Sequence, residues 1–337
     1  MKKIIILALV LSIAVGIILM AVEFGSRDKE NNIELRQHAP NISKNAVTPF
    51  KRLLREGDRL EEYVLRTDAN GFILPSKIHD EPDIDIYFVG GSTTECETVK
   101  EILRFPYLVG RLLEEKTGLK VNAFNAGVGG NNSQHSLNIL IHKILPLQPD
   151  IVVYHHNIND IVQLAYYGNY NAGVSNEEGD DKFSKLRGST VRLDTKSIAL
   201  QYKNALEGFV DACLSKGAQP VLMTQILRTS LDQTPNRLPE SLELTIPQNP
   251  FDSVPEPAFL KVIHMIHKEF NSIIRDEASE HDLLLIDLDR LVPIASADLL
   301  SDNLVHYNDS GSVFVARVIA EQLLGSLGLK QVQHGGI

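Results

Sequence analysis

Short apolar runs alternate with amphipathic stretches along most of the chain. Five apolar runs end in polar or glycine residues and predict strands, at residues 84–89, 121–124, 150–154, 220–224 and 283–287. Helical patterns separate and follow them, over residues 93–117, 133–145, 197–215, 258–279 and 311–327. Strands that alternate with helices predict βαβ units. We therefore expect an α/β fold of three layers, α/β/α, around a five-stranded parallel sheet.

The N-terminal residues 1–22 have a different pattern. Lys2 and Lys3 precede an unbroken apolar run, Ile4–Val22, which as a helix spans roughly 28 Å, close to the thickness of a bilayer core. A cleaved signal peptide usually has a shorter apolar region and a small-x-small cleavage site. We therefore expect an uncleaved signal anchor, a transmembrane helix. The two lysines place its start in the cytoplasm, although Arg27 and Lys29 weaken that assignment.

The rest of the chain is then expected to be extracytoplasmic, in the periplasm or at the cell surface. Residues 23–60 are polar and mixed in charge, and predict a linker to a catalytic domain at 61–330. Within that domain, residues 165–195 and 228–257 do not fit the alternation and are long for simple connections. We expect both to be surface insertions near the site. A lid role and a passive excursion are equally compatible with their sequences.

Charge and cysteine content narrow the classes of function. The formal net charge is −10, which argues against nucleic acid as a partner because phosphate binding requires a basic surface. The two cysteines, Cys96 and Cys213, form no metal-binding spacing. In an exported domain they could pair, but we favour two buried free thiols.

Polar residues follow the predicted strands, at the sheet edge where parallel α/β folds place their sites. After the first strand, Gly90 and Gly91 precede Ser92 at the start of a helix. Glycines permit a sharp turn, and free N–H groups at a helix start favour a developing oxyanion. Ser92 is thus a candidate nucleophile. Alternatively, Ser92-Thr93-Thr94-Glu95 is a helix capping box. A phosphate loop is disfavoured because no lysine follows.

Two further segments offer hydrogen-bond donors. The loop at 125–133 has three glycines in four residues, so the Gly130 N–H could face a reacting oxygen, or the loop could be only a tight turn. After the third strand, Asn159 could donate its side-chain amide, and Asp160 is expected to order the loop. The adjacent histidines 155 and 156 do not suggest a metal site, since neighbours on an extended chain point in opposite directions.

The last polar segment, residues 301–309, follows the fifth strand and contains His306. A histidine here could act as the general base for a serine. An acidic or amide neighbour would hold its tautomer.

Together, in this order, the four segments resemble the conserved blocks of the SGNH hydrolase superfamily, the GDSL-like esterases and lipases. The resemblance covers about residues 84–327. Gly-Gly-Ser-Thr-Thr-Glu at 90–95 and the lead-in at 66–72 are similar to a bacterial branch found beside cell-surface polysaccharide functions. The resemblance implies a flavodoxin-like sheet and a serine esterase that needs no metal or organic cofactor.

The resemblance also implies roles for individual residues. Ser92 would be the nucleophile and would give one backbone N–H to the oxyanion hole, with Gly130 and Asn159 as the other donors. His306 would be the base. The family usually has Asp three residues before this histidine, whereas this chain has Asn303 there and Asp302 one position earlier. Either Asp302 reaches the imidazole, which we favour, or Asn303 orients it.

The expected reaction is removal of a short acyl group, most simply acetyl, from an ester on a cell-surface or secreted polysaccharide. The expected partners are this ester or acylated glycan and the membrane that holds the N-terminal helix. An O-acyltransferase using the same site is an alternative. So is a catalytically weak, membrane-tethered glycan-binding module, because Asn303 departs from the family pattern.

Overall fold

The computed structural model describes residues 35–47, 62–171, 188–227, 238–246, 257–292, 299–301 and 304–326. The chain divides into two units, Met1–Leu35 and Arg36–Ile337, and the description below concerns the second. The predicted anchor lies outside the described residues. Among those residues, no helix has the length and apolar character needed to cross a bilayer.

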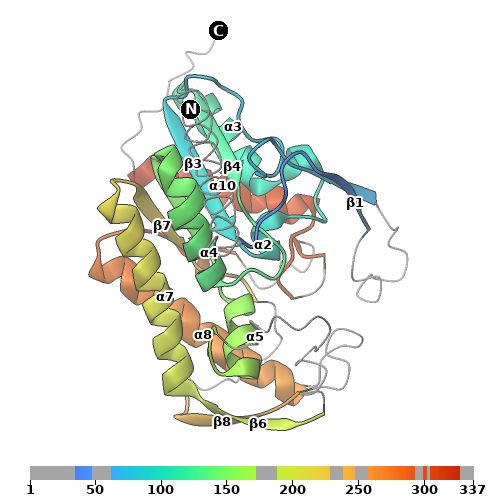
Figure 1. The fold of residues 1–337 in the computed structure, drawn as a ribbon, viewed down its shortest axis with the longest axis vertical. Coiled ribbons are helices and arrows are strands. Elements are labelled where there is room, and N and C mark those ends of the chain that lie inside the picture. The colour runs from blue at the N-terminus through green and yellow to red at the C-terminus, as the bar shows by residue number, and fades with distance from the viewer. Residues whose placement is uncertain are drawn as a thin grey trace, which may run out of the picture. The chain divides into compact units, whose positions relative to one another are not determined.

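Five parallel strands form the central sheet, in the order β4-β3-β5-β7-β9 (Figure 1). They are β3 (Ile84–Gly90), β4 (Val121–Asn125), β5 (Ile151–His155), β7 (Gln219–Met223) and β9 (Leu284–Ile286). All five predicted strands are confirmed, with small shifts at their ends. The order is the flavodoxin-like one, in which the direction of winding reverses between β3 and β5.

Helices cover both faces of this sheet, as expected for a three-layer fold. One face packs on α4 (Ser133–Ile139), α5 (Ile158–Tyr167), α7 (Thr195–Ser215) and α8 (Pro257–Glu280). The other packs on α3 (Phe105–Thr117) and α10 (Asp309–Ser326). Alternate β3 side chains enter the two cores, Tyr87 and Val89 on the first face and Ile86 and Phe88 on the second.

Short helical elements complete the described fold. A π-helical turn at Leu140–Ile144 and a 3-10 turn at Leu145–Leu147 continue α4 towards β5. The short helix α9 (Leu288–Leu291) follows β9.

The single helix predicted at residues 93–117 is wrong, because it is three elements. A four-residue helix, α2 (Ser92–Glu95), ends where Cys96 adopts a left-handed conformation with φ 54°. A 3-10 turn (Glu101–Leu103) follows, and α3 starts anew with Pro106 in its first turn. Proline has no N–H to give to a preceding turn, so it favours a helix start over a helix interior.

The polar linker predicted at 23–60 also needs correction. Its residues 43–47 form the strand β1 (Ser43–Val47), which pairs antiparallel with β2 (Glu62–Arg66). Arg36 and the residues after it belong to the same unit as the sheet. A polar sequence can still order when its backbone pairs, and no hydrophobic pattern marks such a segment.

The two predicted insertions contain an unforeseen sheet of their own. Strand β6 (Thr190–Asp194) lies in the first and β8 (Ser241–Thr245) in the second, and they pair antiparallel. Their inward residues Leu193 and Leu244 are buried in the first core. In Figure 1 this pair lies across one end of α7 and α8. The remaining parts of the insertions, at 172–187, 228–237 and 247–256, lie outside the described residues, so a lid role stays a prediction.

The cysteines are both free and both buried. Cys96 lies in the second core and Cys213 in the first. The free-thiol interpretation is therefore confirmed, and burial raises the pKa of each thiol to about 12.

Candidate active site

Ser92 lies at the carboxyl end of β3, where α2 begins. Gly91, not Ser92, is the N-cap residue, and no side chain caps this helix. The Ser92 Oγ instead lies 2.7 Å from the His306 Nε2. The capping-box interpretation of Ser92 is thus wrong, and the glutamate it required, Glu95, lies with its Oε1 2.8 Å from the His38 Nε2.

The glycines before Ser92 permit a close approach of three chain segments. A Cβ atom at Gly91 would lie 2.2 Å from the Asn159 Nδ2, and one at Gly90 would lie 2.8 Å from the His155 carbonyl oxygen. Both distances are too short for a side chain. The strand pairing explains the closeness, because Gly90 is opposite His155 in the β3–β5 register.

The loop after β4 packs against the short helix that carries Ser92. A Cβ at Gly127 would lie 2.3 Å from the Glu95 amide nitrogen, and Gly130 has a left-handed φ of 76°. At the far end of this loop Asn132 caps α4 through a reciprocal pair of hydrogen bonds with His135. Burial and the nearby Arg36 charge lower the pKa of His135 to about 4, so the neutral ring accepts the Asn132 N–H.

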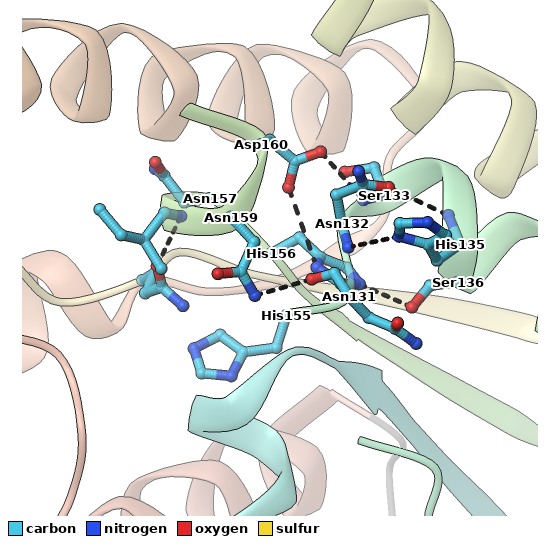
Figure 2. Close-up of polar contacts among 12 residues, drawn as sticks. Asn131, Asn132, Ser133, His135, Ser136, His155, His156, Asn157, Asn159 and Asp160 are labelled. Carbon is cyan, nitrogen blue, oxygen red and sulfur yellow. Dashed lines mark hydrogen bonds and ion pairs between the residues drawn. The ribbon is translucent and has the colours of Figure 1, made fainter. Parts of the chain in front are cut away.

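Asn159 joins the β4 and β5 loops. Its Nδ2 donates a hydrogen bond of 2.8 Å to the Asn131 carbonyl oxygen (Figure 2). An amide carries two N–H bonds, so one remains for another acceptor. The structure thus brings together Ser92, the loop of Gly130 and Asn159, which the sequence had placed in separate motifs.

The backbone around His306 pairs with the residues just before it. The His306 carbonyl accepts the Ser301 N–H at 2.8 Å, and an isolated β-bridge joins Leu300 and Tyr307. The Tyr307 ring packs edge-on against Phe105 of α3. The two candidate partners of the imidazole, Asp302 and Asn303, lie outside the described residues.

A sequence model of the GDSL-like Lipase/Acylhydrolase family matches residues 88–313 of this chain. The chain belongs to the GDSL-like lipase/acylhydrolase family. Membership of this family makes the protein an ester-hydrolysing enzyme. A search of curated proteins found no significant match.

Two solved structures are among those to which this chain is similar. Axe2, an acetylxylan esterase from Geobacillus stearothermophilus, is 15% identical, with a TM-score of 0.47, over 72% of this chain and 94% of its own. A lipase/acylhydrolase from Enterococcus faecalis is 19% identical, with a TM-score of 0.46, over 74% of this chain and 99% of its own. These similarities do not assign a substrate to this hydrolase.

A buried polar network connects the loops after β4 and β5 in this GDSL-like hydrolase. The Asp160 carboxylate accepts the Ser133 N–H at 2.9 Å and the Tyr170 hydroxyl at 2.7 Å. Ser133 in turn shares a hydrogen bond of 2.5 Å with the Tyr154 hydroxyl. Burial raises the pKa of Asp160 to about 6. Asp160 therefore orders the loops, as its position after Asn159 led us to expect.

The side chains of the adjacent histidines point in different directions and contact different residues (Figure 2). His155 contacts the Thr94 hydroxyl at 3.0 Å through Nδ1, and His156 contacts the Ser136 hydroxyl at 2.7 Å through Nε2. Burial lowers the pKa of His155 to about 3 and holds that of His156 well below its usual value. Both rings are therefore neutral packing groups. Within the part of the chain that the structure describes, no three His, Cys, Asp or Glu side chains are grouped as metal ligands.

Three residues at the site escaped the sequence analysis: Arg36, His38 and Asn131. Arg36 donates to the carbonyls of Gly129 and Gly130. Asn131 supplies the carbonyl that receives the Asn159 amide. These contacts join residues 28 to 94 positions apart, so no local pattern could have indicated them.

Proposed function

We propose that this hydrolase cleaves an ester in two steps, with Ser92 as the nucleophile and His306 as its base. The observation that carries the proposal is the 2.7 Å contact between the Ser92 Oγ and the His306 Nε2. With its proton on Nδ1, the neutral imidazole accepts the serine hydroxyl proton through Nε2. The Ser92 oxygen then bonds to the ester carbonyl carbon. The leaving alkoxide takes the proton from His306, and an acyl-serine remains.

Water completes the second step. His306 removes one proton from the water as its oxygen attacks the acyl-serine, then returns that proton to the Ser92 oxygen as the acid departs. Each step passes through a tetrahedral oxyanion. The proposed donors to it are the Ser92 N–H, the Gly130 N–H and the Asn159 Nδ2. In the described residues, neither of the two backbone N–H groups donates to another protein group, which leaves both available.

The partner of the imidazole is proposed from the sequence. Asp302 is favoured because a carboxylate stabilises the imidazolium by charge, whereas Asn303 can only orient the ring. Loss of that charge with the geometry intact lowers turnover by up to about 10⁴-fold on other scaffolds. Asp302→Asn is therefore expected to reduce kcat far more than Asn303→Ala. The reverse order would assign the orienting role to Asn303.

The substrate and the setting are also proposals from the sequence. We propose a short acyl group, acetyl in the simplest case, on a cell-surface or secreted polysaccharide. The apolar run at residues 4–22 supports a membrane anchor with the catalytic domain outside the cytoplasm. No metal or organic cofactor enters the proposed steps.

Hydrolysis of an aryl acetate tests the chemistry with a matched serine control. Ser92→Ala should abolish turnover. Ser215→Ala, which alters an exposed serine at the end of α7, should leave it unchanged. Turnover retained in Ser92→Ala would overturn the assignment.

A mass-tagged acyl donor then follows the acyl group in the presence of a glycan acceptor. Tagged free acid is expected. A tagged sugar ester as the main product would instead make the enzyme an O-acyltransferase. Both outcomes keep the acyl-serine step, which the serine variants test separately.

A further inference from the structure

The segment just before β1 reaches the candidate oxyanion loop. Arg36 donates from Nη1 to the Gly130 carbonyl at 3.1 Å and from Nη2 to the Gly129 carbonyl at 3.2 Å. Its own carbonyl accepts the Asn131 side-chain amide at 2.9 Å. Arg36 thus holds three consecutive residues of this loop, although it lies in the stretch that the sequence predicts to be a linker.

The guanidinium contact fixes the orientation of one peptide plane. In a trans peptide the carbonyl and the N–H point in opposite directions. Because the Gly129 carbonyl points to Arg36, the Gly130 N–H points away from it. A Gly-Gly peptide has few steric barriers to rotation about its neighbouring dihedrals. An outside donor at this carbonyl therefore limits the directions in which the Gly130 N–H can point.

The contacts of Arg36 also bear on the position of Asn159. Arg36 also donates to the Gly130 carbonyl, which shares a peptide group with the Asn131 N–H. That N–H donates to the Val128 carbonyl at 3.0 Å. The next carbonyl along, that of Asn131, receives the Asn159 amide. Fixing the 129–131 backbone therefore places both the Gly130 N–H and the acceptor that positions Asn159.

Arg36 is itself held in place by its neighbours along the chain. The Ala39 carbonyl accepts the Thr67 hydroxyl at 2.8 Å, and the Asn41 N–H donates to the Asp68 carbonyl at 2.9 Å. The His38 backbone passes so close to Gly71 that a Cβ there would lie 2.4 Å from the His38 oxygen. The His38 side chain lies beside Glu95 of the helix that carries Ser92. The segment 36–42 is thus docked against the lead-in at 66–72 and the nucleophile helix.

We infer that Arg36 is a positioning residue, which holds the Gly129–Gly130 peptide so that the Gly130 N–H stays directed into the oxyanion hole. This inference rests on the proposed function of Gly130 as an oxyanion donor. Arg36 does not touch the reacting atoms. Its effect is expected in the transition state, where the oxyanion develops, and not in ground-state binding of the ester.

The experiment compares Arg36→Ala, Arg36→Lys and the control Arg111→Ala in the full-length chain. Arg111 is an exposed arginine on α3 that pairs with Glu114, so its removal changes the net charge equally. Active sites are first counted by labelling with a fluorophosphonate probe. Then kcat and KM for an aryl acetate, inhibition by a phenylboronic acid and the melting temperature are measured for each variant.

Arg36→Ala should lower kcat per labelled site by about tenfold or more, within the range found when an outer group that orients a functional ligand is lost. Boronate affinity should fall by a similar factor, because the boronate forms a tetrahedral adduct on the serine. KM should stay within about twofold. Arg36→Lys should recover part of the loss, since an ammonium can donate to one carbonyl but cannot reproduce the planar fork. Millimolar guanidinium should partly restore Arg36→Ala.

Equal kcat per labelled site in Arg36→Ala and Arg111→Ala would overturn the inference. So would a loss confined to KM, or one that follows only a lower melting temperature and fewer labelled sites. Should Arg36→Ala not fold, the comparison of Arg36→Lys with the control decides by the same criteria. If the wild-type chain neither hydrolyses the ester nor labels at Ser92, the proposed function fails and the inference falls with it. If the wild type passes both tests, only the role of Arg36 is in question.

Discussion

On one side of Ser92, the loops after β4 and β5 meet through hydrogen bonds between residues far apart in the chain, with Asp160 buried beneath them. This oxyanion side comprises residues 125–133 and 156–160. On the other side His306 lies in a short segment, the base side at residues 299–301 and 304–309, where backbone hydrogen bonds join residues a few positions apart. The His306 side chain reaches across the site to Ser92, with its Nε2 2.7 Å from the Ser92 Oγ.

The difference predicts how each side responds to mutation. In the proposed mechanism, side chains of the oxyanion side take part both in chemistry and in holding two loops together, so their loss should lower activity and stability together. The His306 side chain is only partly buried, and its loss should lower activity alone.

The largest effect is expected at His306. His306→Ala removes the proposed base, so kcat should fall by about 10³-fold or more. The free energy of unfolding should change by less than about 1 kcal/mol, because the side chain that is removed is only partly buried. Kinetics with an aryl acetate and urea unfolding measure both, with the exposed His142→Ala as the control.

Adding Ser92→Ala to that variant sharpens the result. Residues that act as one unit have non-additive effects, so the double variant should be about as slow as either single one. A further, multiplicative loss would mean that Ser92 and His306 act independently.

A smaller loss in rate, with a loss in stability, is expected at Asn159. Asn159→Ala removes a proposed oxyanion donor and should lower kcat by about 10²- to 10³-fold. It also removes the hydrogen bond to the Asn131 carbonyl, which should lower the free energy of unfolding by about 1 kcal/mol. The control is Asn169→Ala, in the exposed turn after α5, which should keep its kcat. An unfolding change without a kcat change would remove Asn159 from the oxyanion hole.

The last effect is on stability alone and concerns the pH dependence that Asp160 contributes. Burial raises its folded pKa to about 6, above the ordinary 3.8. The folded state then binds the proton more tightly than the unfolded state, so this group's contribution to stability falls as pH rises from about 4 to about 6. The total change is about 3 kcal/mol, from about 1.4 kcal/mol per pKa unit.

Asp160→Asn isolates this contribution, since other titrating groups cancel in the comparison. The difference in unfolding free energy, wild type minus variant, should decline between pH 4 and pH 6 and then level off. A flat difference over that range would show that Asp160 titrates normally and that its network is not as buried as described.

Much of the fold follows from the sequence, because the five central strands are apolar runs long enough to be recognised by pattern. The pairing of β6 with β8 could not be foreseen, because each strand buries few residues and its partner lies about 50 positions away in an irregular segment. The end of α2 at Cys96 was missed for a different reason. A left-handed conformation at a non-glycine residue leaves no signature in the hydrophobic pattern.

At the site, sequence motifs indicated Ser92, Gly130, Asn159 and His306, because each follows a strand. The same motifs could not show that the Ser92 hydroxyl is hydrogen-bonded to His306 instead of capping its own helix, since residues 92–95 fit both interpretations. Nor could they indicate Arg36. Its role comes from contacts with a loop more than 90 positions away, in a segment without apolar pattern.

The central claim is that Ser92, activated by His306, forms the covalent acyl-enzyme. The most direct measurement is to treat the full-length chain with a fluorophosphonate probe and locate the adduct by peptide mass spectrometry. We predict one adduct per chain, on the peptide that contains Ser92, formed far more slowly in His306→Ala and prevented by a phenylboronic acid. An adduct on another serine, or ester hydrolysis by a chain that never labels at Ser92, would contradict the account.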